Sequence, residues 1–162
     1  MIEVEIDEDG WTEALPDVAA LAASAASATL DFEGHGVDPG VVILLTGDLQ
    51  QRGLNLQFRG KDAATNVLSF PASPGAGPRH LGDIALAFVV CAREAAEQGK
   101  PLEDHLQHLT AHGVLHLLGY DHETDAEAES MEARERQILA GLGVPDPYAE
   151  RGDQGDHGQH GH

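Results

Sequence analysis

The feature that most constrains this chain is the stretch HGVLHLLGYDH at residues 112–122. His112 and His116 stand four residues apart, so on a helix their imidazoles project from one face and can reach a common ion. Gly119 follows the last predicted helical turn, where a glycine reverses the chain without steric cost and returns His122 toward the other two. Three imidazoles leave one position of a tetrahedral zinc ion open, which is typical of a catalytic site.

The spacing His-x-x-x-His-x-x-Gly-x-x-His is also that of metzincin proteases, in which the residue after the first histidine is the glutamate that acts as general base. Gly113 occupies that position in this chain. A metal frame without its usual base favours different chemistry on the same ligands. Gly113 also lies in the apolar stripe of its helix, which predicts close packing of the helix backbone against a sheet.

Two further histidines, His105 and His108, precede the predicted ligands on the same helix, which we expect over residues 101–118. His108 and His116 are two turns apart, about 12 Å along the axis, so they cannot share an ion through Zn–N bonds of about 2.1 Å. We therefore interpret His108 as a residue that supports the ligands or lines the cleft, and His105 as an ordinary surface histidine.

Composition limits the class of protein. The chain has 162 residues, 41% of them hydrophobic, and its one cysteine, Cys91, excludes an internal disulfide framework and a cysteine-based zinc site. The N-terminus lacks the basic and apolar regions of a signal peptide, and no run of about 18 apolar residues occurs. We expect a soluble cytoplasmic protein with no membrane partner.

The charge is distributed unevenly along the chain. The formal net charge is −19, yet residues 40–79 hold four basic side chains against two acidic ones, a balance of 4 − 2 = +2. A locally basic segment in an acidic protein can meet phosphate, while the acidic remainder suppresses indiscriminate binding to nucleic acid. The charge pattern therefore allows a polyanionic substrate at one place on the surface.

Hydrophobic periodicity predicts a sheet covered by helices. Strands are expected at residues 2–6, 41–46, 66–70 and 81–87, and helices at residues 11–25, 47–56, 88–98, 101–118 and 124–142. The run at residues 41–46 is apolar at five successive positions, which indicates a central strand buried on both faces. The last twelve residues, 151–162, form a polar tail rich in glycine and histidine, which we expect to be disordered.

Three ordered motifs in this chain resemble the YbeY family of metal-dependent endoribonucleases. They are LNLQFRGKDAATNVLSFP at residues 54–71, LGDIAL at residues 81–86 and GKPLEDHLQHLTAHGVLHLLGYDH at residues 99–122, and the DPY at residues 146–148 also fits. The resemblance implies an α/β (α+β) fold over a single domain at residues 1–150. We expect a small mixed four-stranded sheet packed with about five helices, the zinc-site helix being central.

The resemblance also assigns roles to particular residues. It implies one Zn²⁺ per chain, bound by His112, His116 and His122, in agreement with their spacing. The family's functional arginine falls on Arg59, which implies a catalytic role for Arg59, together with His112 and His116, and substrate binding by Arg59 and by Lys61 of the same RGKD motif. The metal would act as a Lewis acid while Arg59 neutralises charge on the phosphate.

The resemblance implies single-stranded RNA as substrate, with roles in 16S rRNA 3′ end maturation and ribosome quality control. It also implies contacts with the small ribosomal subunit or a ribosome-assembly GTPase. Two other classes stay open, namely a metzincin-like zinc protease that lacks the usual glutamate, and a non-catalytic assembly module stabilised by zinc. The general base stays open as well, between Asp121 and a metal-bound hydroxide.

Overall fold

The structure, a computed structural model, describes residues 2–35, 39–72 and 80–148, so the predicted tail at residues 151–162 lies outside the described residues. The strands are β1 (Ile2–Ile6), β2 (Gly40–Thr46), β3 (Val67–Pro71) and β4 (His80–Ala87). The helices are α1 (Asp9–Ala14), α2 (Val18–Phe32), α3 (Asp48–Arg59), α4 (Phe88–Gln98), α5 (Leu102–Leu117) and α6 (Asp125–Gly141).

The four strands form one mixed sheet in the order β1-β2-β4-β3. β1 pairs with β2 and β2 with β4 in parallel, whereas β3 runs antiparallel to β4 along the other edge. The prediction of a small mixed four-stranded sheet is therefore confirmed. Its central pair, β2 and β4, places Ile43 opposite Ile84, and both side chains are fully buried.

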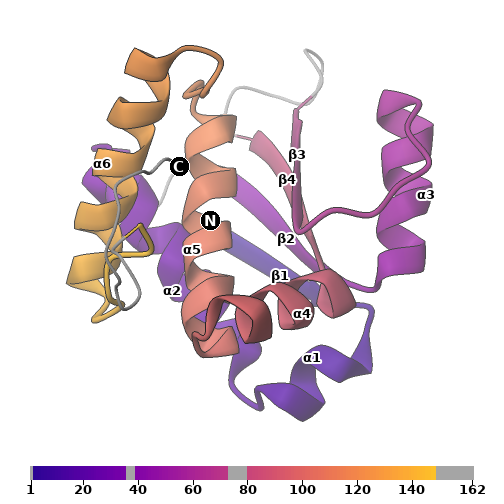
Figure 1. The fold of residues 1–162 in the computed structure, drawn as a ribbon. Coiled ribbons are helices and arrows are strands. Elements are labelled where there is room, and N and C mark those ends of the chain that lie inside the picture. Colours follow the sequence, from indigo (N-terminus) through magenta and orange to yellow (C-terminus); the bar gives the residue numbers. More distant parts are fainter. Residues whose placement is uncertain (1, 36–38, 73–79, 149–162) are drawn as a thin grey trace.

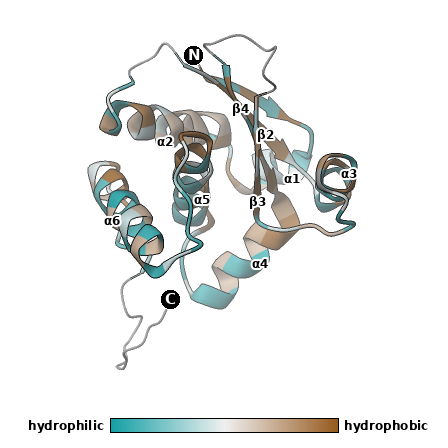
Figure 2. Ribbon diagram, turned by 90° about the horizontal axis from the view of Figure 1, so that it is seen from above, coloured by the Kyte–Doolittle hydropathy of each residue, from teal (hydrophilic) through white to brown (hydrophobic). Residues whose placement is uncertain are grey.

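Helices cover the two faces of the sheet unequally. Figures 1 and 2 show α2, α5 and α6 on one side of the sheet and α3 on the other. Ile43 and Leu45 face the larger helical layer and are fully buried, whereas Val42 and Leu44 face α3 and are only half-buried. The prediction that β2 is buried on both faces is therefore wrong, because a single helix covers only part of the second face.

The first apolar stripe folds as two helices, which makes six helices in the described part of the chain where about five were expected. Pro16 has no N–H to donate and separates α1 from α2. Trp11 of α1 is fully buried and donates from Nε1 to the carbonyl of Thr46 at 3.0 Å. The short helix is thereby held against the end of the central strand.

Helix α5 lies between the sheet and α6, as expected for the helix that carries the histidine motif (Figure 1). Its buried residues include Leu106, Leu109 and Val114, which belong to the main core. In the described part of the chain, no helix is both long and apolar enough to cross a membrane. The central position of α5 places its last two turns beside the edge strand β3.

Candidate metal centre

Three histidines converge where α5 ends. His112 and His116 project from the last turns of α5, and one ligand atom of each, with one of His122, lie within 4.8 Å of one another. Gly119 has φ +103°, the left-handed region that glycine adopts without strain, and turns the chain so that His122 returns. The convergence predicted from the spacing is confirmed.

The donor set suits a zinc ion. Two Zn–N bonds of about 2.1 Å span at most about 4.2 Å, so small ring rotations would bring these ligand atoms onto one ion. Burial and the neighbouring rings of His112 and His122 lower the pKa of His116. A lowered pKa favours the neutral imidazole, which is the form that binds metal.

The histidines form one wall of a pocket of about 310 Å³, and β3 forms the other. Besides the three histidines, the lining residues are Asn66, Val67, Leu68, Ser69 and Pro71. Ser69 donates from Oγ to the carbonyl of Gly113 at 3.2 Å, which fixes the edge strand against α5. The candidate metal centre therefore opens onto the amide of Asn66, just before β3, and the hydroxyl of Ser69 on β3.

Gly113 packs against the sheet as predicted. A Cβ atom added there would lie 3.0 Å from Cγ2 of Ile84, which is tighter than nine in ten real Cβ contacts. A side chain at this position would require the Ile84 side chain to shift by a few tenths of an ångström. The position that carries the general base in metzincin proteases is therefore packed against the sheet in this fold.

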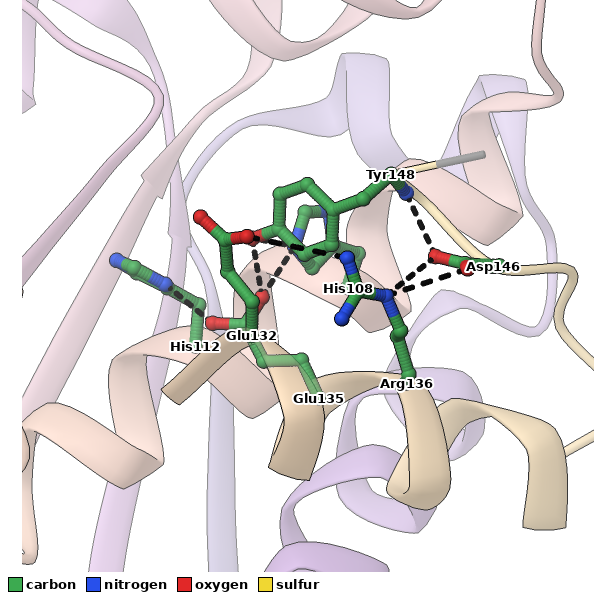
Figure 3. A network of polar contacts seen from close by, with 7 residues as sticks. All are labelled: His108, His112, Glu132, Glu135, Arg136, Asp146 and Tyr148. Atoms are coloured by element: carbon green, nitrogen blue, oxygen red, sulfur yellow. Dashed lines mark hydrogen bonds and ion pairs between the residues drawn. The ribbon is translucent and has the colours of Figure 1, made fainter. Parts of the chain in front are cut away.

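Glu135 of α6 is a residue of the site that the sequence analysis missed. Its carboxylate is fully buried and accepts from His112 Nδ1 at 2.6 Å through Oε2 and from His108 Nε2 at 2.8 Å through Oε1 (Figure 3). Tyr148 also donates its hydroxyl to Oε1. Burial alone would raise the pKa of Glu135, but the hydrogen bonds from His108 and His112 outweigh it and lower the pKa to about 2.

A signal for Glu135 was present in the sequence. Met131, Glu135, Ile138 and Leu142 follow one helical stripe, so a carboxylate stands where an apolar residue is expected. A buried carboxylate needs hydrogen-bonding partners, and a histidine-rich helix elsewhere in the chain can supply them. The interpretation of His108 as a residue that supports the ligands agrees with this contact.

The interpretation of His105 as a surface residue is wrong. Only 3% of His105 is exposed, because α4 packs beside the first turns of α5. Its Nε2 lies 2.9 Å from Oε1 of Glu94, and the same oxygen accepts from Asn66 at 3.0 Å. Burial lowers the pKa of His105, and the hydrogen bond to Glu94 only partly offsets that effect.

Helix α3, which ends at Arg59, lies on the other side of β3 from α5 (Figure 1). Arg59 is the last residue of α3, and its side chain lies outside the described part of the structure. Lys61 is exposed and follows Gly60, whose φ of +72° ends the helix. Among the described side chains, neither Lys61 nor Asp121 lines the histidine pocket. Oδ1 of Asp121 instead accepts from the amide of His122 at 2.8 Å.

Comparison with known proteins gives one consistent family. The family model described as Endoribonuclease YbeY matches residues 3–143. A protein of that name from Jannaschia is 52% identical over 160 residues, covering 91% of this chain and 99% of its own length. Another, from Azorhizobium caulinodans, is 51% identical over 153 residues, covering 91% and 96%.

A solved structure supports the fold independently. The solution structure of a protein from Thermotoga maritima superposes with a TM-score of 0.55 at 24% sequence identity, covering 95% of this chain and all of that one. At this level of identity the likeness concerns the fold alone.

Proposed function

Because this chain belongs to the endoribonuclease YbeY family, we propose that it cleaves single-stranded RNA with a zinc ion held by His112, His116 and His122. The observation that carries the proposal is the convergence of these three side chains at an open pocket. When bound there, zinc supplies Lewis-acid chemistry toward a phosphoryl oxygen and lowers the pKa of water.

The chain's own residues prepare this chemistry. Glu135 accepts from Nδ1 of His112 and so leaves Nε2 of that ring to face the metal. Asn66 and Ser69 line the opposite wall, where the second amide hydrogen of Asn66, the one not donated to Glu94, can contact phosphate or ribose. The binding surface for RNA is therefore expected along β3.

We assign Arg59 to charge neutralisation on the phosphate, with Lys61 as a second contact. One arrangement of the helices and the chemistry of arginine support this assignment. Figure 1 shows α3 and α5 ending at the same end of the molecule, on opposite sides of β3. The end of α3 thus lies toward the same end of the molecule as the end of α5, which carries the histidines (Figure 1), and the planar donors of a guanidinium suit a phosphate.

The cellular role proposed is maturation of the 16S rRNA 3′ end and ribosome quality control in the cytoplasm. This role rests on family membership and on the RNA substrate. Contacts with the small ribosomal subunit or a ribosome-assembly GTPase are proposed on the same basis.

The experiment that tests the activity compares cleavage of a single-stranded RNA by wild type and Arg59→Ala, with casein as a second substrate. We expect wild type to cleave RNA and leave casein intact, and Arg59→Ala to be about 100-fold slower or more. Arg93→Ala, an exposed arginine of α4, is the matched control and should cleave at the wild-type rate.

Two outcomes of this experiment would favour the other classes. Cleavage of casein but not RNA would establish a protease. If neither substrate is cleaved with any divalent metal, yet zinc is needed for folding, the chain is an assembly module without catalytic activity.

A further inference from the structure

His112 belongs to two pairs of histidines on α5. It lies four residues after His108 and four before His116, so all three side chains follow one face of the helix. Nδ1 of His112 lies 2.6 Å from Oε2 of Glu135, and the ring centre of His112 lies 4.9 Å from the ring centre of His116. One ring nitrogen is therefore committed to Glu135, and the other is left for the cluster with His116 and His122.

The position of Glu135 is fixed by three donors. One carboxylate oxygen accepts from His112, and the other accepts from His108 and from the hydroxyl of Tyr148 (Figure 3). Glu135 is fully buried, where a carboxylate without partners would be strongly unfavourable. Any shift of this side chain would break at least one of these hydrogen bonds.

Tyr148 reaches Glu135 from the segment that follows α6. The amide of Tyr148 donates to Oδ1 of Asp146 at 2.8 Å, and Asp146 also accepts from Nε of Arg136 at 3.2 Å. The guanidinium of Arg136 lies over the tyrosine ring, 5.3 Å from its centre. These contacts of the DPY motif at residues 146–148 hold the ring of Tyr148 so that its hydroxyl points toward Glu135 (Figure 3).

We propose that Glu135 and Tyr148 are positioning residues of the metal centre. Glu135 holds His112 in the tautomer with its proton on Nδ1, so that Nε2 presents a lone pair to the metal, and Tyr148 holds Glu135 in place. Carboxylates that bind the second nitrogen of a metal-binding histidine raise metal affinity by about 10- to 100-fold. The inference rests on the proposed metal centre and extends it to α6 and the DPY motif.

The first test measures the zinc dissociation constant of the full chain by competition with a chromophoric chelator. We expect Glu135→Gln to weaken zinc binding by about 10- to 100-fold, because an amide no longer selects the Nδ1-protonated ring. Glu129→Gln, the same change at an exposed position of α6, should bind zinc as wild type does. His116→Ala lacks one of the three proposed ligands and therefore measures how much zinc the histidines of the tail bind on their own.

The second test reads the ring of His112 directly. In ¹⁵N-edited NMR spectra of the metal-free chain, wild type should show the His112 proton on Nδ1, and Glu135→Gln should show a mixture of the two tautomers. A purely structural role for Glu135 predicts no change of tautomer.

Tyr148→Phe keeps the proposal testable if Glu135→Gln does not fold. Removing one hydrogen bond of about 1 kcal/mol predicts zinc binding weaker by about fivefold. Wild-type zinc affinity in folded Glu135→Gln, or in Tyr148→Phe, would overturn the inference while leaving the metal centre intact. Absence of zinc binding by wild type itself would instead overturn the proposed metal centre.

Discussion

At the scale of single residues, Gly113 separates this site from the protease frame that its spacing resembles. Gly113 occupies the position that holds a catalytic glutamate in metzincins. A Cβ atom added to Gly113 would point into the sheet, 3.0 Å from Cγ2 of Ile84 and 3.4 Å from Oγ of Ser69. The helix therefore packs closely enough for β3 to form the opposite wall of the histidine pocket. Gly113 therefore supplies no carboxylate to the site and lets the helix pack closely against the sheet.

Substitution of Gly113 by alanine should destabilise the protein by about 1–3 kcal/mol, because the new methyl group overpacks the contact with Ile84. Gly53→Ala in α3 is the matched control, since nothing lies within 4 Å of a Cβ atom there. The control should be neutral or stabilising by up to about 1 kcal/mol. Urea unfolding measures both values, and equal stabilities for the two variants would contradict the packing described for Gly113.

At the scale of elements, the sequence predicted most strands and helices, because their apolar periodicity follows directly from the faces they bury. The helix predicted at residues 124–142 is α6, which begins with a capping box formed by Thr124 and Glu127. Contacts between distant elements escaped prediction. Glu135 meets His112 only because α5 and α6 pack side by side, and His105 is buried only because α4 covers it. Spacing within one helix can mark Glu135 as a buried carboxylate, but it does not identify the residue on another helix that contacts it.

The contact between α4 and α5 predicts a dependence of stability on pH. Burial lowers the pKa of His105 below its value of about 6.5 in the unfolded chain. The groups that act on it are Glu94, Lys100 and His108. The unfolded state then binds more protons, so this contribution to stability is complete above about pH 6.5 and is lost as pH falls below it.

The comparison of wild type with His105→Gln isolates this contribution. Wild type should lose more free energy of unfolding than the variant between about pH 7 and pH 5, because only wild type must bury a histidine that the unfolded chain protonates. Urea unfolding at each pH gives the difference. Parallel pH profiles would show that His105 does not titrate differently in the folded and unfolded states.

At the scale of the whole molecule, the net charge of −19 sets a background of repulsion. Only nine basic side chains stand against 28 acidic ones, and the described ion pairs engage few of the acids. Repulsion between like charges destabilises the compact state, and salt screens it over about 10 Å at 0.1 M. Residues 40–79, whose formal charge is positive, are therefore the part of the chain best suited to approach RNA.

Screening predicts that the melting temperature rises by a few degrees when sodium chloride increases from about 0.02 M to about 0.2 M. Sucrose at the same osmolarity controls for effects unrelated to charge and should raise the melting temperature less. Differential scanning calorimetry of the zinc-free chain provides the measurement. A melting temperature that falls with salt would indicate that attractive ion pairs outweigh the repulsion.

The most direct test of the central claim is the rate of single-stranded RNA cleavage by the full chain, stripped of metal and then titrated with zinc. We predict no cleavage before zinc is added, a rate that rises until about one zinc ion per chain is bound, and no response in His116→Ala. Full cleavage by the metal-free chain, or the same response in His116→Ala as in wild type, would contradict a catalytic metal centre at His112, His116 and His122.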